Sequence, residues 1–384
     1  MSPKDASRIL PAPKSDFVGL EGKAHFATGG EPPLLKVHRQ SFERFAADKS
    51  GGFDGYWRHW EEADQVRQSL ARMTQAEPGD IGLVGNASEA IMRVVASLDW
   101  RAGDNVVVPA LDYTSGRYAL AGLKSRGVDV RLVPGRGWWI ERDDILAACD
   151  DRTRLVYLSQ VNALTGQHHD IAALARGLEG ADAVLLVDAS HALGVVPVDA
   201  RASDFVVSCC YKFVLGIHDG ILIWNRRRRP DFTPYGAGWA SASPGATPAD
   251  YRLKPDARRV EFGNAGHLGA YLLRDSLAYL ESFGIDTIAA HARAQAARLV
   301  AGMTALGLEV MTPDDPAQHA ANAAFVHPDP EGLTRRAAAE NILVWGDNGR
   351  IRASAHLFTT EEDVEILLDS LPRLLNGGRP SPEC

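Results

Sequence analysis

The feature that most constrains the fold of this chain is a series of short, continuously apolar runs between residues 81 and 224. Runs without polar alternation are typical of strands that are buried on both faces of a sheet. Helical patterns separate several of the runs, which predicts an open α/β sheet with helices on both faces. The ligand of such a sheet binds beyond the carboxyl ends of its strands. The seven runs span residues 81–84, 105–109, 128–133, 155–158, 183–187, 205–207 and 220–224.

The chain beyond these runs is organised differently. Residues 230–260 are rich in Pro, Gly, Ala and Ser and predict a long loop, which at this length is often functional. We predict an N-terminal arm (1–20), a large α/β domain with a seven-stranded mixed sheet (21–255) and a small C-terminal α+β domain (256–384). The small domain is predicted from helical patterns at 268–283, 288–306 and 361–375 and from apolar runs at 308–311, 323–326 and 342–345.

Composition narrows the class of protein. The 384 residues are 45% hydrophobic, which is enough for a sizeable core. The formal charge of -8 argues against a nucleic-acid or anionic-membrane partner. No segment approaches the ~18 apolar residues of a membrane span, and the four cysteines have no zinc-type spacing. We therefore expect no membrane partner, no metal site and a location in the reducing cytoplasm.

Two charged residues follow neighbouring runs of the predicted sheet. Asp188 ends the run at 183–187, and Lys212 comes shortly after the run at 205–207. A charge at the end of a buried strand is costly unless a partner compensates it. Pyridoxal 5'-phosphate (PLP) would satisfy both residues, because its pyridine nitrogen pairs with a carboxylate and its aldehyde forms a Schiff base with a lysine. A structural ion pair between Asp188 and Lys212 is the alternative.

The segment around these residues resembles a known family. Residues 20–375 are similar to the class V aminotransferase family of fold type I PLP-dependent enzymes, which includes cysteine desulfurases, selenocysteine lyase and kynureninase. The Tyr-Lys pair is closer to kynureninase than to the desulfurases, which place His before the lysine. The resemblance rests on the pattern Asp188…His191…Ser208-Cys-Cys-Tyr-Lys212…Gly216.

The resemblance implies a role for each matching residue. Lys212 would form the internal aldimine, and Asp188 would pair with the pyridine nitrogen. His191 would lie near the phenolic oxygen of the cofactor, and the Tyr211 hydroxyl would bind the phosphate. Lys212, Asp188 and His191 are thus the predicted catalytic residues.

A turn of small residues after the first run predicts an anion site. Residues 85–90 end a strand and open a helix, whose first N–H groups and dipole favour an anion. An ordinary helix N-cap has the same pattern, and both interpretations can hold together. The turn matches the family's phosphate-binding position, with Ala87 and Ser88 as the contacts.

Two further residues match positions that surround the cofactor in the family. Tyr113 follows the second run, where family members carry an aromatic residue or His stacked on the pyridine ring. A packed loop tyrosine is the alternative. Asn162 follows the fourth run and is predicted to contact the phenolic oxygen.

Two later segments resemble phosphate contacts. Residues 235–239 are similar to a kynureninase loop in which an indole N–H meets the phosphate, which assigns Trp239. Residues 260–264 resemble a turn that reaches the phosphate of the neighbouring subunit, which assigns Asn264 in place of the usual Thr. The resemblance therefore implies a homodimer with a shared active site.

Residues 349–363 resemble the family's Arg-x-Ser segment, whose arginine forks onto the substrate α-carboxylate. This assigns Arg352 as the substrate-binding residue, with Arg350 expected to face solvent. A carboxylate anchor beside a Schiff-base lysine implies a small-molecule α-amino acid as substrate.

The reaction itself is less constrained. Desulfurases of the family carry a reactive Cys shortly before the arginine, and residues 345–350 hold none, which argues against persulfide formation. Residues 168–170 (His-His-Asp) are expected to be a solvated helix start rather than a metal site. We expect a lyase that cleaves at the β-carbon. The alternatives are an aminotransferase, a racemase, epimerase or specialised biosynthetic PLP enzyme, and a PLP-binding protein without turnover.

Overall fold

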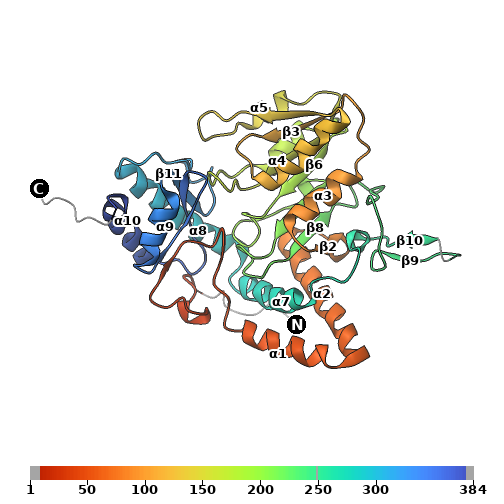
Figure 1. The fold of residues 1–384 in the computed structure, drawn as a ribbon, viewed down its shortest axis with the longest axis horizontal. Helices are drawn as coiled ribbons and strands as arrows, with labels where there is room; N and C mark the ends of the chain where they lie inside the picture. The colour runs from red at the N-terminus through yellow and green to blue at the C-terminus, as the bar shows by residue number, and fades with distance from the viewer. Residues whose placement is uncertain (1–8, 248–249, 378–384) are drawn as a thin grey trace, which may run out of the picture.

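The computed structural model describes residues 9–247 and 250–377. The predicted arm therefore begins outside the described residues, which exclude 1–8. Figure 1 shows a large α/β part built around the central sheet and a smaller part that contains the C-terminal elements. None of the helices of the described chain is both long and apolar enough to cross a membrane.

Helices and strands alternate through the large part, as the apolar runs predict. The helices are α1 (His38–Lys49), α2 (Gly52–Thr74), α3 (Ala87–Ser97), α4 (Thr114–Ala121), α5 (Arg142–Ala147), α6 (Ile171–Gly177), α7 (His267–Glu281), α8 (Ile285–Ala305), α9 (Pro330–Ala338) and α10 (Glu361–Leu375). The strands of the large sheet are β2 (Ile81–Val84), β3 (Asn105–Pro109), β4 (Asp129–Val133), β5 (Thr153–Ser159), β6 (Val184–Asp188), β7 (Phe205–Cys209) and β8 (Gly220–Trp224).

The central sheet has seven strands in the order β2-β8-β7-β6-β5-β3-β4. Strand β8 runs antiparallel to both of its neighbours, and the other pairs are parallel. The fold class is therefore confirmed: a seven-stranded mixed sheet covered by helices. Since β5, β6 and β7 are parallel neighbours, the residues that follow them meet at one edge of the sheet.

Both faces of this sheet are buried, which explains the continuous apolar runs. Alternate residues of one strand point to opposite faces, so Val106 and Val107 of β3 belong to two different hydrophobic cores. One core packs against α2, α6, α7 and α8, and the other packs against α3 and α4. Both faces of the strand therefore favour apolar residues, and its sequence does not alternate between polar and apolar residues.

The C-terminal part has its own core and a small antiparallel sheet. The order of that sheet is β11-β14-β13, with α8, α9 and α10 packed around it. A parallel pair joins the N-terminal strand β1 to β12, so residues near both ends of the chain share this core. These strands are β1 (Ala24–His25), β11 (Asn322–Val326), β12 (Ile342–Leu343), β13 (Trp345–Asp347) and β14 (Arg350–Ser354).

Two predicted elements differ from the structure. Residues 308–311 form no strand, only a single bridge from Val310 to Phe325. The predicted loop at 230–260 contains a β-hairpin, β9 (Ala242–Pro244) with β10 (Tyr251–Leu253), which projects from the molecule in Figure 1. Short 3-10 helices complete the fold at Lys14–Asp16, Pro78–Asp80, Gly122–Arg126, Ala200–Ala202 and Ala257–Val260.

Candidate active site

A cavity of about 330 Å³ lies at the carboxyl edge of the central sheet. Its walls come from the turns that follow β2, β3, β5, β6 and β7, so the topology gathers residues that are far apart in sequence. Seven of the residues assigned from the sequence line it, namely Ala87, Ser88, Tyr113, Asp188, His191, Tyr211 and Lys212. Further lining residues that the sequence did not single out as contacts include Ser115, Ser159, Ser190, Cys209 and His218.

Asp188 and Lys212 both face this cavity from neighbouring strands. Asp188 is 4% exposed and Lys212 is 7% exposed. The Asp188 carboxylate accepts hydrogen bonds from the Ser190 backbone N–H at 2.8 Å and from the Tyr157 hydroxyl at 3.2 Å. No ion pair within the described chain joins Asp188 to Lys212, so the structural ion-pair alternative is wrong. Two buried, oppositely charged groups share one cavity without contacting each other.

His191 is the polar contact of the lysine. Its Nε2 lies 3.2 Å from Lys212 Nζ, and its Nδ1 lies 3.1 Å from the Asn322 side chain. Burial lowers the pKa of His191 well below its ordinary value, and the charges of Lys212 and the nearby arginines lower it further. The imidazole is therefore neutral, with one ring nitrogen donating and the other accepting. The contact with Asn322 thus influences which of the two ring nitrogens of His191 carries the proton.

The start of α3 forms one end of the cavity. The Asn86 side chain caps the helix by accepting a hydrogen bond from the Glu89 N–H at 2.8 Å, so the N-cap interpretation is confirmed. The Ser88 hydroxyl contacts Ser115 Oγ at 2.8 Å. Gly220 lets the strand backbone approach this turn, because a Cβ there would lie 2.4 Å from the Asn86 carbonyl carbon. The helix N-terminus and two hydroxyls thus face the cavity and suit a phosphate.

Aromatic rings surround the lysine head. Lys212 Nζ lies 5.3 Å from the ring centroid of Tyr113 and 5.7 Å from that of Tyr211. Tyr113 is 44% exposed, so its ring borders the open side of the cavity rather than packing in a core. Tyr211 stacks on His218 with ring centroids 4.4 Å apart, and burial raises its pKa. Sequence reasoning missed His218, which no motif marks.

A second buried carboxylate lies behind Tyr113. Asp112 accepts hydrogen bonds from the Ser159 backbone N–H, the Ser159 hydroxyl and the Tyr113 backbone N–H, at 2.7, 2.5 and 2.7 Å. Burial raises the pKa of Asp112 to about 6, and the nearby Asp188 charge adds to that rise. Asp112 therefore ties the turn that carries Tyr113 to the end of β5.

Asn162 is placed differently from the residues above. Its Oδ1 accepts from the backbone N–H groups of Leu164 and Thr165, and its Nδ2 donates to the Leu111 carbonyl. The side chain is 1% exposed and is not among the residues that line the cavity. In this chain Asn162 shapes the turn after β5, and its predicted contact with the phenolic oxygen stays a prediction.

Both arginines of β14 are buried. Arg352 and Arg350 are each 3% exposed, and both donate to the Ala163 carbonyl, at 2.9 and 3.2 Å. The expectation that Arg350 faces solvent is wrong, because residues two apart in a strand lie on the same face. Burial, together with the neighbouring Arg350 charge, lowers the pKa of Arg352 to about 9. Since Ala163 lines the cavity, the arginines lie directly behind its wall.

Trp239 and Asn264 lie away from this cavity. Trp239 is 62% exposed and meets Trp60 edge to face, and Asn264 accepts a hydrogen bond from the Tyr56 hydroxyl at 3.1 Å. Neither of them lines the cavity that holds Lys212. Within one chain, the fold therefore does not bring these two residues to the other predicted site residues.

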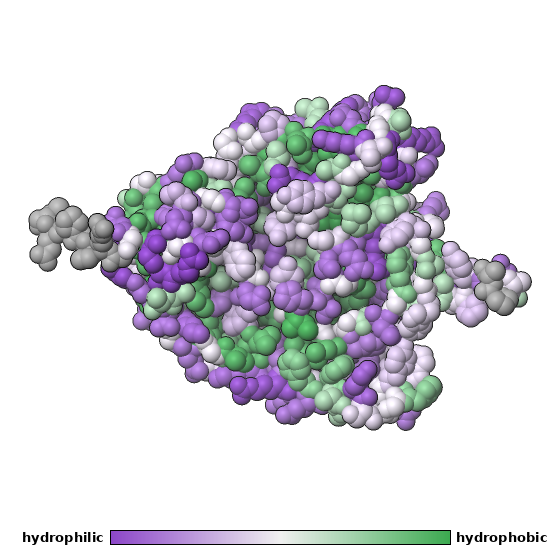
Figure 2. Space-filling model, viewed as in Figure 1, coloured by the Kyte–Doolittle hydropathy of each residue, from purple (hydrophilic) through white to green (hydrophobic). Residues whose placement is uncertain are grey.

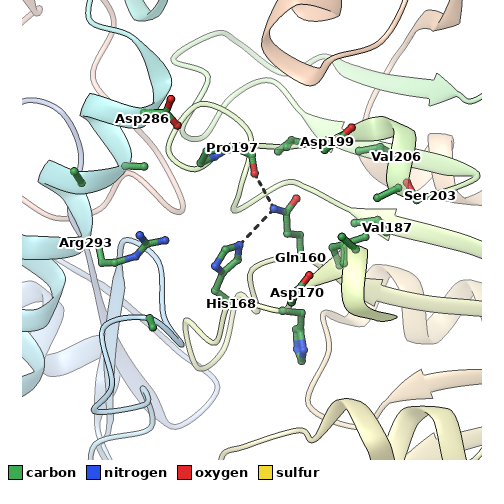
Figure 3. Close-up of a pocket in the computed structure, with 18 residues that line it drawn as sticks. Gln160, His168, Asp170, Val187, Pro197, Asp199, Ser203, Val206, Asp286 and Arg293 are labelled. Carbon is green, nitrogen blue, oxygen red and sulfur yellow. Dashed lines mark hydrogen bonds between the residues drawn. The ribbon is translucent and has the colours of Figure 1, made fainter. Parts of the chain in front are cut away.

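A larger cavity, of about 550 Å³, holds none of the predicted site residues (Figure 3). Gln160 there contacts His168 and the Pro197 carbonyl. Asp170 caps α6 as expected for a helix start, but His169 is buried, so that part of the solvated-turn expectation is wrong. Within residues 9–247 and 250–377, no group of His, Cys, Asp and Glu could hold a metal ion.

Comparison with known proteins agrees with this geometry. The family model described as aminotransferase class-V matches residues 31–367. A probable cysteine desulfurase of Methanothermobacter thermautotrophicus is 26% identical over 406 residues, covering 98% of this chain and 99% of the relative. Isopenicillin N epimerase of Streptomyces clavuligerus is 27% identical, covering 81% and 84%. The apo structure of a cysteine desulfurase from Thermococcus onnurineus NA1 shares the fold, with a TM-score of 0.88, 20% identity and coverage of 97% and 100%.

The chain therefore belongs to the class V aminotransferase family, and it is a PLP-dependent enzyme. The residues present fit that cofactor. A buried lysine amine, a buried carboxylate without a cationic partner among the described residues, and a helix N-terminus with hydroxyls face one cavity. These are the groups that an aldehyde, a pyridinium nitrogen and a phosphate require.

Proposed function

We propose that Lys212 binds PLP as a Schiff base and that the enzyme acts on an α-amino acid, most directly by cleaving a bond to its β-carbon. One observation carries the proposal: Lys212 and Asp188 are buried, face the same cavity and do not pair with each other. Leaving both charges uncompensated would be costly in a folded protein. A cofactor that bonds to the amine and pairs with the carboxylate removes that cost.

The bound cofactor supplies an electron sink that makes bonds at the substrate α-carbon easier to break. Asp188 would keep the pyridine nitrogen protonated, and Tyr157 and Ser190 hold its carboxylate in place. Lys212 would move the proton at the substrate α-carbon. The neutral His191 beside Nζ would orient the lysine and face the phenolic oxygen.

Other residues would position the cofactor and the substrate. The N-terminus of α3, with Ala87 and Ser88, would bind the phosphate, and the Tyr211 hydroxyl would add a donor. Tyr113 would cover the pyridine ring, since its ring already borders the lysine head. Arg352 would bind the α-carboxylate through its planar fork.

Cleavage at the β-carbon is supported by relatives named as cysteine desulfurases and by one named kynureninase. Residues 345–350 hold no cysteine, so we propose a cleavage that forms no enzyme persulfide. Epimerisation is the second candidate, favoured by the similarity to isopenicillin N epimerase. Transamination is a third, because uncharacterised aminotransferases are also among the relatives.

We further propose a homodimer whose two active sites each use residues of both subunits. Exposed apolar side chains on α1 and α2 support it: Phe42, Phe53 and Trp57 are 43%, 76% and 51% exposed. Figure 2 shows hydrophobic residues gathered over the lower part of this view, where α1 and α7 lie. Asn264 would reach the partner's phosphate, and the Trp239 indole N–H would contact a phosphate. The cytoplasm stays the predicted location.

A panel of amino acids, combined with mass analysis of the products, tests the reaction. The purified holoenzyme should change its visible absorbance with its substrate and should release a product shortened at the β-carbon. An intact product with inverted configuration would support epimerisation, and a keto acid with all its carbons would support transamination. Unchanged absorbance with every α-amino acid would contradict the proposal.

A further inference from the structure

An unusual concentration of buried polar atoms without partners lies behind one wall of the cavity. Arg350 Nε, Arg352 Nε and the hydroxyls of Thr28 and Ser354 have no hydrogen-bond partner among the described residues. Thr28 and Ser354 are fully buried, and both arginines are 3% exposed. Buried polar groups are nearly always hydrogen-bonded in folded proteins. Such a cluster indicates a polar ligand that completes these bonds.

The charge of the cluster indicates what the ligand is. Two guanidinium groups converge on one acceptor, the Ala163 carbonyl, and are therefore close together. The acid nearest to them is Asp347, which lies 3.1 Å from Arg350 Nη1, has a side chain that is 38% exposed and also accepts the Trp345 indole N–H. One half-exposed carboxylate does not neutralise two buried cations. An α-carboxylate bound to Arg352 would compensate only one of them.

Local packing holds Arg352 in this place, and Arg350 is held by its contacts with the Ala163 carbonyl and Asp347. A Cβ on Gly29 would lie 3.0 Å from the Arg352 guanidinium carbon and 2.6 Å from Ser354 Oγ. A Cβ on Gly30 would lie 2.2 Å from the Trp345 ring. The loop at residues 29–30 therefore packs tightly against Arg352, Ser354 and Trp345. Burial lowers the pKa of Arg350 as well, which agrees with a cation that lacks a full counter-charge.

We propose that Arg350 binds a second acidic group of the substrate, so that the enzyme acts on α-amino acids whose side chain ends in a carboxylate or a similar oxyanion. This inference rests on the proposed function and specifies its substrate class. Arg352 holds the α-carboxylate, and Arg350, two residues earlier on the same face of β14, holds the side-chain acid. Two adjacent forks select a diacid over a monoacid because each adds a charge-assisted pair of bonds.

Binding of unreactive acids to the holoenzyme tests this assignment without turnover. Succinate and glutarate are compared with butyrate and valerate by titration calorimetry. The diacids should bind the wild-type protein roughly tenfold or more tightly, because one more charged hydrogen-bonded pair is formed. Arg350→Gln should abolish this preference, and Arg350→Lys should retain part of it. Arg335→Gln is the matched control, because Arg335 is an exposed arginine paired with Glu331, and it should leave the preference unchanged.

Each outcome decides the question. A wild-type protein that binds diacids and monoacids equally would overturn the proposal even if Arg350→Gln failed to fold. A preference that persists in a folded Arg350→Gln variant would show that Arg350 is a structural partner of Asp347 only. Failure of the proposed function is distinguishable, because the cofactor would then be absent from Lys212 whatever the acids do. A labelled Lys212 without diacid preference rejects this inference alone.

Discussion

The two arginines of β14 show how the surroundings of one residue decide its role. Sequence resemblance assigned only Arg352 to the substrate and placed Arg350 in solvent. The structure buries both on one strand face, with both donating to the Ala163 carbonyl. Motif matching did not detect this, because the strand register that pairs β14 with β11 and β13 is a tertiary property.

Arg352→Lys should raise KM for acid substrates by roughly ten- to a hundredfold, because a lysine cannot reproduce the planar fork and a charged hydrogen-bonded pair contributes about 1.5–3 kcal/mol. The visible absorbance of the bound cofactor should stay intact, since Arg352 is assigned to the substrate carboxylate and not to the cofactor. Steady-state kinetics and an absorbance spectrum check both expectations. An unchanged KM would mean that the substrate has no α-carboxylate.

Other site residues were beyond sequence reasoning for a related reason. Asn322 orients His191 from β11, 131 positions along the chain, and Tyr157 reaches Asp188 from the neighbouring strand. Neither belongs to a local motif. Asp188, Lys212, His191 and Ser88 were predictable because each ends or follows a buried strand, and the carboxyl ends of such strands are where an open α/β sheet binds its ligand.

At the scale of elements, the seven central strands were predictable because burial on both faces leaves continuous apolar runs. Strand β14 was not predicted as a strand, since its arginines interrupt the apolar pattern that marks the others. Residues 308–311 are apolar enough for a strand but pair only through Val310. Of these four residues only Met311 is buried, so a short apolar run does not by itself establish either burial or strand pairing.

The N-terminus of α3 has a structural role and a proposed binding role. The Asn86→Ala variant tests both, and a control variant tells them apart. Losing this cap should lower the free energy of unfolding by about 1 kcal/mol. It should also weaken cofactor retention, because the capped turn lines the cavity. Chemical denaturation and dialysis against phosphate measure the two effects. Asp170→Ala removes the equivalent cap of α6 and is the control: it should lower stability similarly without releasing cofactor. Equal cofactor loss in both variants would contradict the assignment.

At the scale of the whole molecule, His356 links the two parts of the chain. Its Nε2 lies 2.8 Å from the Phe213 carbonyl, and its ring stacks on Phe213 of the large part. Burial, together with the nearby His291 and His25, lowers the pKa of His356 to about 4. Between about pH 6.5 and pH 4, the His356 imidazole binds a proton in the unfolded chain but not in the folded chain. Stability is therefore lost as the pH falls through this window.

The free energy of unfolding of the wild-type protein should include a His356 contribution that falls by up to about 1.4 kcal/mol per pH unit below pH 6.5. Asp112 acts in the opposite direction, because its raised pKa of about 6 stabilises the protonated fold. Comparing wild type with His356→Asn cancels the Asp112 effect. Urea unfolding at pH 7.5, 6.5 and 5.5 should give a flatter profile for the variant. Parallel profiles would show that His356 does not titrate in this way.

The proposed dimer also belongs to this scale. Lys212→Ala and Asn264→Ala chains should each be inactive as homodimers, because each lacks one component of both sites. A mixed dimer would contain one site with an intact Lys212 and an intact Asn264 from opposite subunits. After subunit exchange, the mixed dimers should therefore regain part of the wild-type activity. If the Asn264→Ala homodimer is inactive and verified heterodimers regain no activity, a shared site is contradicted.

The most direct test of the account is to find which lysine holds the cofactor. The holoenzyme is reduced with borohydride, digested and analysed by mass spectrometry. We expect a pyridoxyl group on the peptide that contains Lys212, and we expect the Lys212→Ala variant to lose both the label and the visible absorbance. A pyridoxyl group on any other lysine, with Lys212 unmodified, would contradict the central claim.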